Sequence, residues 1–468
     1  MADEPQTTYN GPVAADGGDA IDTRGSQGTV VKPSGPVTQY FNTIYNFIDD
    51  KFIKRLGLGQ RVGFMLLAIL IIGMGISLYF LLRPRQPTQM VGDFRIAVAG
   101  FVVQGSAEEL DVEVGEEFAY GVYLHLVQTF SEFPGIVVWG PDKVDRVKGN
   151  EAASRAISAN EIAQKLDADM IIYGVVDIAD LGWTVTPEFY VTAENFHQAQ
   201  EVTGQHELGT PVVIKGRGNP ADRRNVSTEL AARTQVLSYI AIGLADYANH
   251  DYEQALASFQ SAEQVPDWED DEGKQVLYLL SGNAAGRVGD LALAESYHTK
   301  SLALDPEYAR AYVGLAGVHY MQALKPYEET NDPTETDITF LEQSIATYKT
   351  ALDAKHQPAL SDISTKVHFG LGQCHFALVY SGNATYFDAA IGEFKQVIDT
   401  YADGANPRIR EITAESYARL ALIYDLSGYP DLASEHYQEA ANLLWDDVER
   451  QALYEARART VTLESSNP

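Results

Sequence analysis

Three side chains of the types that bind zinc lie within one short stretch of the sequence. They are His368, Cys374 and His375, and imidazole and thiolate are ligands that zinc prefers. Structural zinc sites use four ligands at fixed short spacings, whereas this chain has one cysteine, which also excludes an intramolecular disulfide. The alternative is that the three residues pack between helices. The element that positions them decides between the two interpretations.

Two other stretches are candidates for binding an ion or a phosphate, and neither has the residues that this requires. The acidic run at 267–273 lacks the ladder of oxygen ligands of a calcium loop. The segment after Phe101, VVQGSAEELDVEVGEE, has acidic residues where a glycine-rich loop would hold a phosphate. The motifs HExxH, GxSxG, GxxxxGK and CxxC do not occur in the sequence. The sequence therefore predicts a protein that is not an enzyme and that holds no metal or other cofactor.

The composition is that of a folded chain with room for two or three domains. The chain has 468 residues, of which 45% are hydrophobic and 21% are charged. Its net charge of −31 argues against nucleic acid as a partner, because phosphate binding needs basic surfaces. The same charge is also typical of a well-solvated acidic surface.

One apolar segment is long enough to cross a membrane. Residues 62–82 contain no charged side chain, and Arg61 and Arg83 bracket them. At about 1.5 Å per residue, a helix of this length matches a hydrocarbon core of about 30 Å. A long segment precedes it, which argues against a cleaved signal peptide. We therefore expect a single-pass anchor in the cell membrane, and not a buried core helix.

Flanking charges predict the orientation of this anchor. The N-terminal side has more basic residues than the C-terminal side, and such residues favour the cytoplasm. We therefore expect a cytoplasmic N-terminus and extracytoplasmic C-terminal domains. The residues compared are Lys51, Lys54, Arg55 and Arg61 on one side, and Arg83, Arg85 and Arg95 on the other.

The segment before the anchor has two parts. Residues 1–37 are rich in glycine, proline and polar residues without an apolar period, which predicts disorder. Residues 38–60 carry apolar side chains at helical spacing and end in basic residues, which predicts an amphipathic helix at the membrane interface or against a partner helix. The apolar residues are Phe41, Ile44, Tyr45, Ile48, Phe52 and Leu56.

Residues 90–215 alternate between strand and helix patterns. Short apolar runs at 95–101, 136–140 and 170–176 predict strands, with helical spacing between the three, and 184–191 is one more extended stretch. We therefore expect a mostly parallel sheet. Trp139 and Asp142 lie at the end of the second strand, where such sheets bind ligands, and packing is the alternative explanation for Trp139.

This region resembles a known domain family. The residues that carry the resemblance are RIAVAGF, EEFAYGVYLHLVQTFSEFPGIVVWGPDKV, IAQKLDADMIIYGVV and VTGQ, in that order. They are similar to the small α/β domain at the N-terminus of TolB-like proteins. The resemblance implies an α/β fold at 90–215 and a setting in the bacterial cell envelope or in sensory proteins, where such domains often accompany helical repeats.

A polar linker is predicted at 216–228, and a repeating pattern follows it. Small and bulky residues recur in units of about 34 residues that end near a proline. The unit starting at Gln275 shows the pattern through Tyr278, Gly282, Ala294, Ser301 and Pro306. Similar units start at 236 and 414, and two more fit with insertions. The segment 229–445 thus resembles a tetratricopeptide array of five units, which implies an all-α superhelical solenoid, and 446–468 supplies a capping helix and tail.

The register of the repeats decides the zinc question raised above. His368 and His375 fall at positions where the pattern requires large packing side chains, as do His298 and His319. We therefore interpret these histidines as packing residues between helices.

The resemblance also implies a binding groove, because the first helix of each unit lines the concave face of such arrays. Three cations and two amides at these positions suggest capture of a carboxylate-bearing peptide segment, and the alternative is that the cations pair with acidic neighbours. The predicted groove residues are Asn283, Arg287, Arg310, Tyr320, Lys366, Gln373 and Phe376.

Two functions follow from this organisation. The first is a membrane-anchored scaffold or accessory subunit that recruits protein partners, or assembles a larger membrane complex, at the bacterial cell envelope. The alternative is a single-pass sensory receptor whose α/β domain binds a small ligand.

Overall fold

A computed structural model describes residues 89–465, with the gaps given below, together with residues 20–21 and 30–31. The chain divides into two units, Met1–Gln86 and Pro87–Pro468. The residues not described in the second unit are 87–88, 106–108, 180–181, 197–198, 216–219, 267, 269–272, 359–362, 403–408, 446 and 466–468.

The first unit contributes one described pair of strands. Strand β1 (Ala20–Ile21) pairs antiparallel with β2 (Val30–Val31), inside the segment predicted to be disordered. The predicted amphipathic helix at 38–60 and the predicted membrane span at 62–82 lie outside the described residues. Among the helices that are described, none has the length and apolar character needed to cross a membrane.

The second unit begins with a mixed sheet in the order β5-β3-β6-β7-β8. Strands β5, β3 and β6 are parallel, and β4 also runs parallel to β6. Strands β8 and β9 both pair antiparallel with β7. The bounds are β3 (Phe94–Val98), β4 (Val102–Gln104), β5 (Ile136–Trp139), β6 (Met170–Ala179), β7 (Gly182–Val191), β8 (Gly204–Glu207) and β9 (Val212–Lys215).

The expectation of a mostly parallel sheet is therefore wrong for one half of it. Strand β6 ends at Ala179 and β7 begins at Gly182, so the connection is far too short for the crossover that a parallel neighbour requires. The two strands instead pair antiparallel over their whole length, from Met170 opposite Val191 to Ala179 opposite Gly182.

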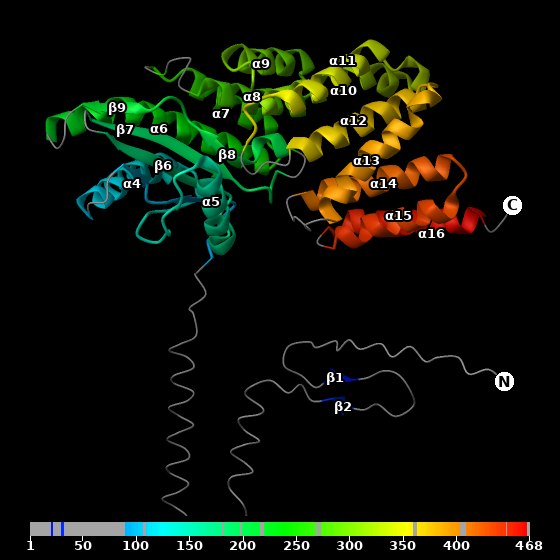
Figure 1. The fold of residues 1–468 in the computed structure, drawn as a ribbon, viewed down its shortest axis with the longest axis horizontal. Coiled ribbons are helices and arrows are strands. Elements are labelled where there is room, and N and C mark those ends of the chain that lie inside the picture. Colours follow the sequence, from blue (N-terminus) through cyan, green and yellow to red (C-terminus); the bar gives the residue numbers. More distant parts are fainter. Residues whose placement is uncertain are drawn as a thin grey trace, which may run out of the picture. The chain divides into compact units, whose positions relative to one another are not determined.

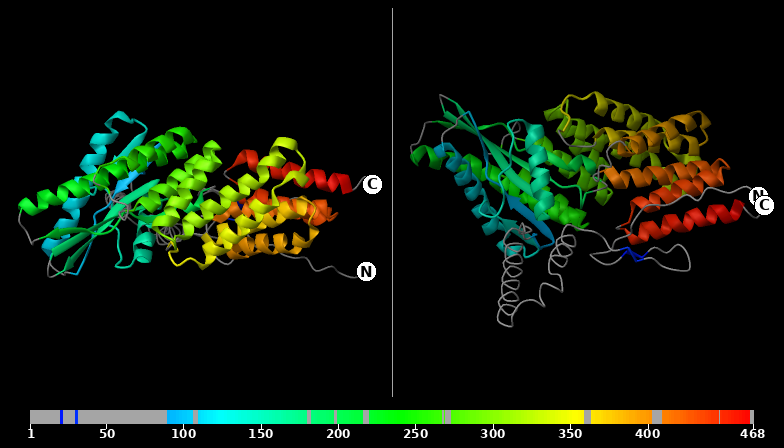
Figure 2. Two further views of the ribbon diagram at one scale, coloured as in Figure 1. Left: turned by 90° about the horizontal axis from the view of Figure 1, so that it is seen from above. Right: turned by 60° about the horizontal axis from the view of Figure 1, so that its bottom comes forward.

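Helices cover the sheet on both faces (Figures 1 and 2). Alternate side chains of β3 point to opposite faces, so Ile96 packs with α4 and Ala97 packs with α5. Helix α6 shares the face of α4, through residues such as Val236 and Ile240. The helices are α4 (Glu109–Thr129), α5 (Ala152–Leu166) and α6 (Pro220–Ala248), with short 3-10 turns η1 (Phe130–Glu132) and η2 (Gln200–Val202).

The predicted linker at 216–228 is wrong from Pro220 onward, because α6 begins there. Proline is favoured at the first position of a helix, where its missing N–H has no intrahelical partner to lose. A proline in a polar stretch was therefore a helix start and not a sign of a flexible linker. Helix α6 is also the first helix of the repeat array, so the sheet and the array share one hydrophobic core that extends to α8.

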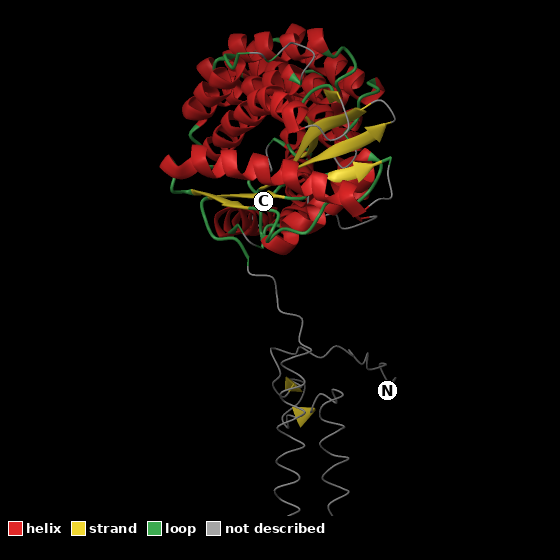
Figure 3. Ribbon diagram, turned by 90° about the vertical axis from the view of Figure 1, so that its left-hand side faces the viewer, coloured by secondary structure: helices red, strands yellow, loops and turns green. Residues whose placement is uncertain are grey.

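Five helical pairs and a final helix follow one another through the rest of the described chain (Figures 1 and 3). Together they form a tetratricopeptide-like solenoid beside the small sheet. The pairs begin with α6 and α7 (Tyr252–Glu263), followed by α8 (Lys274–Val288) with α9 (Leu291–Leu304), α10 (Ala309–Thr330) with α11 (Ile338–Asp353), α12 (Ile363–Tyr380) with α13 (Phe387–Ala402), and α14 (Arg410–Leu426) with α15 (Pro430–Leu443). Two 3-10 turns, η3 (Pro333–Glu335) and η4 (Ala384–Tyr386), and the last helix α16 (Val448–Ser465) complete the array.

Small residues let the two helices of a pair approach each other. A Cβ atom built on Gly282 of α8 would lie 2.7 Å from the ring of His298 on α9, and one on Gly372 of α12 would lie 2.8 Å from the ring of Phe394 on α13. These are the small and bulky positions that the sequence pattern identified. His298 is accordingly a buried packing residue, and burial lowers its pKa to about 3.

Candidate functional site

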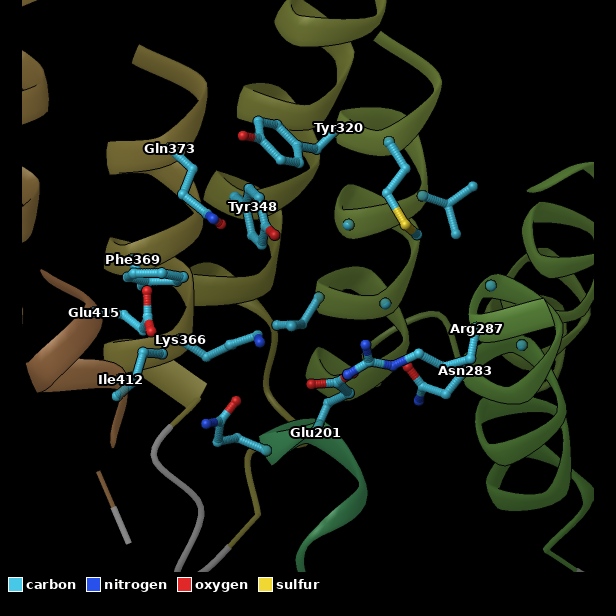
Figure 4. A pocket seen from close by; sticks show the side chains of 18 of the residues that line it. Glu201, Asn283, Arg287, Tyr320, Tyr348, Lys366, Phe369, Gln373, Ile412 and Glu415 are labelled. Carbon is cyan, nitrogen blue, oxygen red and sulfur yellow. The ribbon is translucent and has the colours of Figure 1, made fainter. Parts of the chain in front are cut away.

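The concave face of the array contains a cavity of about 450 Å³ (Figure 4). The first helices of successive units, α8, α10, α12 and α14, supply most of its wall. The turn η2, which comes from the sheet region, closes part of it with Gln200 and Glu201. The site is thus built from repeats that are far apart in sequence and from one segment outside the array.

Most of the predicted groove residues line this cavity, namely Asn283, Arg287, Tyr320, Lys366 and Gln373. The structure brings them together because equivalent positions of stacked first helices face the same side. Phe376 and Arg310 are not among the lining residues. Phe376 stacks on Tyr380 and packs against the core of α13 and α14, so it lies at the side of α12 and not in the cavity.

The prediction that Arg310 lines the groove is wrong, because its side chain is buried and only 1% exposed. Its guanidinium donates to three backbone carbonyls of the sheet region, those of Glu201 at 2.9 Å, Thr203 at 2.6 Å and Gln205 at 3.0 Å. Repeat register correctly placed Arg310 at the start of a first helix. It could not show that a segment more than 100 residues earlier covers this position.

Glu201 is the residue on which the predicted cations converge. It is 5% exposed, and its Oε2 atom has no hydrogen-bond partner among the described residues. Figure 4 shows its carboxylate between Arg287 and Lys366. Burial lowers the pKa values of Lys366 and Arg310, and the negative charge of Glu201 opposes both shifts. The basic strip predicted to capture a carboxylate therefore already faces one from its own chain.

Arg287 is held by aromatic residues as well as by this charge. Its Nε donates to the hydroxyl of Tyr247 at 3.3 Å, and its guanidinium stacks over the ring of Tyr252, 5.7 Å from the centroid. Asn283, one turn earlier on α8, donates its side-chain amide to the carbonyl of Leu279 at 3.2 Å.

The other end of the cavity has charged residues that the sequence analysis missed. Glu411, Glu415 and Arg419 come from α14, and Arg450 comes from the capping helix α16. Arg450 lies 2.8 Å from Glu411 and 3.6 Å from Glu415. Glu415 occupies the second position of the fifth unit, so the groove rule applied to that unit would have found it. No local sequence pattern indicates that Arg450 lines the cavity, because its position depends on how the capping helix α16 packs against α14.

Arg419 differs from its charged neighbours in this part of the cavity. Within the described residues it makes no ion pair and no hydrogen bond, and its Nε atom is buried without a partner. Glu415, the nearest carboxylate along its helix, instead accepts a hydrogen bond of 3.0 Å from the hydroxyl of Tyr454. The N–H groups of the half-buried Arg419 guanidinium are thus available to bind an acceptor from a ligand.

Aromatic side chains form the middle of the cavity. Tyr320, Tyr348 and Phe369 line it together with Met321 and Val318. Burial raises the pKa of Tyr320 to about 12, so its hydroxyl stays protonated at neutral pH. The cavity therefore has charged ends and a more apolar centre.

His368, Cys374 and His375, whose side chains could bind zinc, each have a different neighbour. His368 Nδ1 lies 2.7 Å from Glu393, the His375 ring stacks on Tyr386, and the Cys374 sulfur lies 3.2 Å from the Ser344 hydroxyl. Burial raises the pKa of the Cys374 thiol to about 12. Among the described residues, no group of three metal-ligating side chains is close enough to hold an ion.

A second cavity, of about 540 Å³, lies on the face of the sheet beside α5. A buried ion pair lies at its edge, in which Arg155 Nη2 donates to Glu188 at 2.5 Å. Asp177 and Glu207 also line it. Trp139 and Asp142, the residues considered for a ligand crevice, are not among its lining residues, and Lys143 covers the Trp139 ring at 5.6 Å.

Comparisons with known proteins find similarity of fold only. No family model and no curated protein matches the chain. Three solved structures that align with it are a thermophilic tetratricopeptide protein of Thermus thermophilus (20% identity, 47% of this chain and 98% of that one, TM-score 0.34), the Cut9–Hcn1 hetero-tetramer of APC/C (16%, 51% and 39%, TM-score 0.34) and yeast Tom70 (13%, 77% and 62%, TM-score 0.32). At these TM-scores the alignments do not indicate a function.

Proposed function

We propose that this protein is a membrane-anchored scaffold that recruits protein partners through the concave face of its repeat array. The observation that carries the proposal is the cavity of about 450 Å³ formed by the first helices of successive units. A cavity that crosses several repeats fits an extended segment better than a compact small molecule. Its charged ends and aromatic centre can hold both the polar backbone and the apolar side chains of such a segment.

The partner is a segment that bears a carboxylate, from a single protein or from a larger membrane complex. Arg287, Lys366, Arg419 and Arg450 outnumber the carboxylates of Glu201, Glu411 and Glu415 in the cavity wall. This excess of positive charge stands out in a chain with a net charge of −31. It supports an anionic ligand over a cationic one.

The location proposed for this scaffold is the bacterial cell envelope. The apolar segment at 62–82 supports a single-pass anchor, and its flanking charges support an N-terminus in the cytoplasm with the sheet and the array outside it. The resemblance of 90–215 to the N-terminal domain of TolB-like proteins supports the same setting.

Site-specific photo-crosslinking in native membranes tests the function. We expect a photoreactive aromatic residue in place of Tyr320, inside the cavity, to crosslink a defined partner. The same residue in place of Gln343, which is exposed on α11, is the control. Identical crosslinks from both positions, or crosslinks to lipid alone, would contradict binding in the cavity.

A sensory receptor is the second candidate, and the polar cavity on the sheet supports it. Hydroxyl, amide and carboxylate groups surround this cavity, among them Thr184, Thr186 and Asp177. A receptor of this type should be stabilised by one small polar metabolite, because a ligand that binds only the folded state raises its melting temperature. Thermal-shift screening of the purified chain separates the two candidates.

A further inference from the structure

Two charged side chains that face the same cavity each have a buried atom without a hydrogen-bond partner among the described residues. Glu201 is 5% exposed and its Oε2 accepts no hydrogen bond from the described residues, while the Nε of Arg419 is buried and donates none. A buried polar atom without a partner is costly, and such atoms are uncommon in folded proteins. One is an acceptor and the other a donor, and they line the same cavity.

The cations around Glu201 are poorly placed to hold a second carboxylate. Arg310 donates to backbone carbonyls, and Arg287 donates to the hydroxyl of Tyr247. Both Arg287 and Lys366 already interact electrostatically with Glu201. A carboxylate brought beside them would also lie beside Glu201, and like charges repel strongly away from water. An uncharged N–H group avoids this repulsion and supplies the donor that Oε2 lacks.

At the opposite end, the two carboxylates of α14 that line the cavity with Arg419 are engaged by other residues. Arg450 Nη2 donates to Glu411 at 2.8 Å, and the Tyr454 hydroxyl donates to Glu415 at 3.0 Å. Arg419 is therefore the cation of this wall whose guanidinium can accept a new carboxylate without breaking an existing pair. A planar guanidinium also suits such a group, since it can bind both oxygens at once.

We infer that the cavity holds its partner segment in one direction, with a backbone N–H of the segment bound to Glu201 and a carboxylate of the segment bound to Arg419. The apolar side chains between these two groups rest on Tyr320 and Phe369. This inference rests on the proposed protein-binding function and assigns the two ends of the segment. It also moves the carboxylate site from the cations predicted by sequence to Arg419.

The test uses the full chain in detergent micelles and a library of short random peptides. Half of the library ends in a free carboxylate and half is amidated. We expect the selected peptides to share one carboxylate at a fixed distance from an apolar residue. One selected peptide, its analogue with the carboxylate replaced by an amide, and a set of singly N-methylated analogues are then measured by fluorescence anisotropy.

Arg419→Gln should weaken the acidic peptide about tenfold, the usual effect of losing a charge-assisted hydrogen bond, and should leave the amide analogue unchanged. The matched control is Lys349→Gln, which removes a cation from the exposed side of α11 and should change neither affinity. If Arg419→Gln weakens both peptides equally or neither of them, the carboxylate assignment is wrong.

Glu201→Met tests the other end of the segment, because methionine has no side-chain oxygen that could accept the N–H. One N-methylated analogue should bind the wild type about tenfold more weakly than its parent, and this difference should largely disappear in the variant. Glu201→Asp, which keeps the charge but has a shorter side chain that does not reach the N–H, should behave in the same way and covers the case in which Glu201→Met does not fold. If no N-methyl effect depends on Glu201, this end is wrong. If no peptide binds the wild type, the protein-binding function itself fails.

Discussion

The guanidinium of Arg310 lies 2.9 Å from Nε2 of His206, and the two residues are 104 positions apart in the sequence. His206 is buried in the sheet region and stacks on Phe189, while Arg310 begins a helix of the third repeat. The contact joins the sheet region to the array through two groups that cannot both be charged without repulsion.

Stability should fall as the pH drops below about 6.5. Burial lowers the pKa of His206 well below its ordinary 6.5, and Arg310 lowers it further. Below pH 6.5 the unfolded chain therefore binds a proton at His206 that the folded chain does not bind. The contribution of His206 to stability is complete above pH 6.5 and is lost progressively below it. Denaturant titrations at several pH values measure the slope.

The variant His206→Gln is the control for this pH dependence. Glutamine does not titrate, so the slope between pH 6.5 and pH 5 should become smaller. His298, whose pKa burial lowers to about 3, should account for part of what remains. An unchanged slope would show that His206 is not responsible.

Replacing Arg310 should destabilise the fold strongly. Arg310→Met leaves the carbonyls of Glu201, Thr203 and Gln205 buried without their donor. At about 1–3 kcal/mol for each unsatisfied buried group, we expect a loss of at least 3 kcal/mol in the free energy of unfolding. Lys349→Met, at an exposed position, should stay within about 0.5 kcal/mol. Chemical denaturation followed by circular dichroism measures both.

Two glycines of α8 should respond to alanine in opposite directions. Gly282→Ala puts a methyl group 2.7 Å from the His298 ring, so we expect a loss of about 1–3 kcal/mol from overpacking. Gly286→Ala meets nothing closer than 3.6 Å, so we expect a gain of up to about 1 kcal/mol from the better helix former. Melting temperatures of the two variants compare them directly, and equal shifts would contradict the packing described here.

The buried ion pair of the sheet region should depend on both partners. Arg155→Met leaves the Glu188 carboxylate in a buried site, so we expect a loss of about 3–5 kcal/mol. The double variant Arg155→Met with Glu188→Met removes the stranded charge and should recover most of that loss. Urea unfolding of the wild type and the two variants provides the comparison. A double variant that is less stable than Arg155→Met would contradict this account.

Sequence reasoning succeeded where the determining contacts are local or repeat. Gly282 and His298 belong to one unit, and the same pairing of small and large residues recurs as Gly372 and Phe394. Such a recurring pattern can be read without knowing the fold. The cavity residues on α8, α10 and α12 followed from the same register.

Sequence reasoning failed where the role of a residue depends on contacts with a segment from another part of the chain. The roles of Arg310 and Glu201 arise from the packing of η2 into the array, and neither residue has a neighbour in sequence that indicates this. The extended stretch at 184–191 was predicted, but the antiparallel direction of β7 was not, because its apolar alternation is compatible with either direction. Arg419 and Arg450 acquire their positions only when the last helices stack.

Helix α6 is at once a covering layer of the sheet and the first helix of the array. We therefore expect that the two regions do not fold as separate modules. A recombination event that moved the repeats alone would either expose one face of the sheet to solvent or leave α7 without the helix that it packs against. We expect that genetic shuffling can divide this chain before Pro87, and that everything after it travels together.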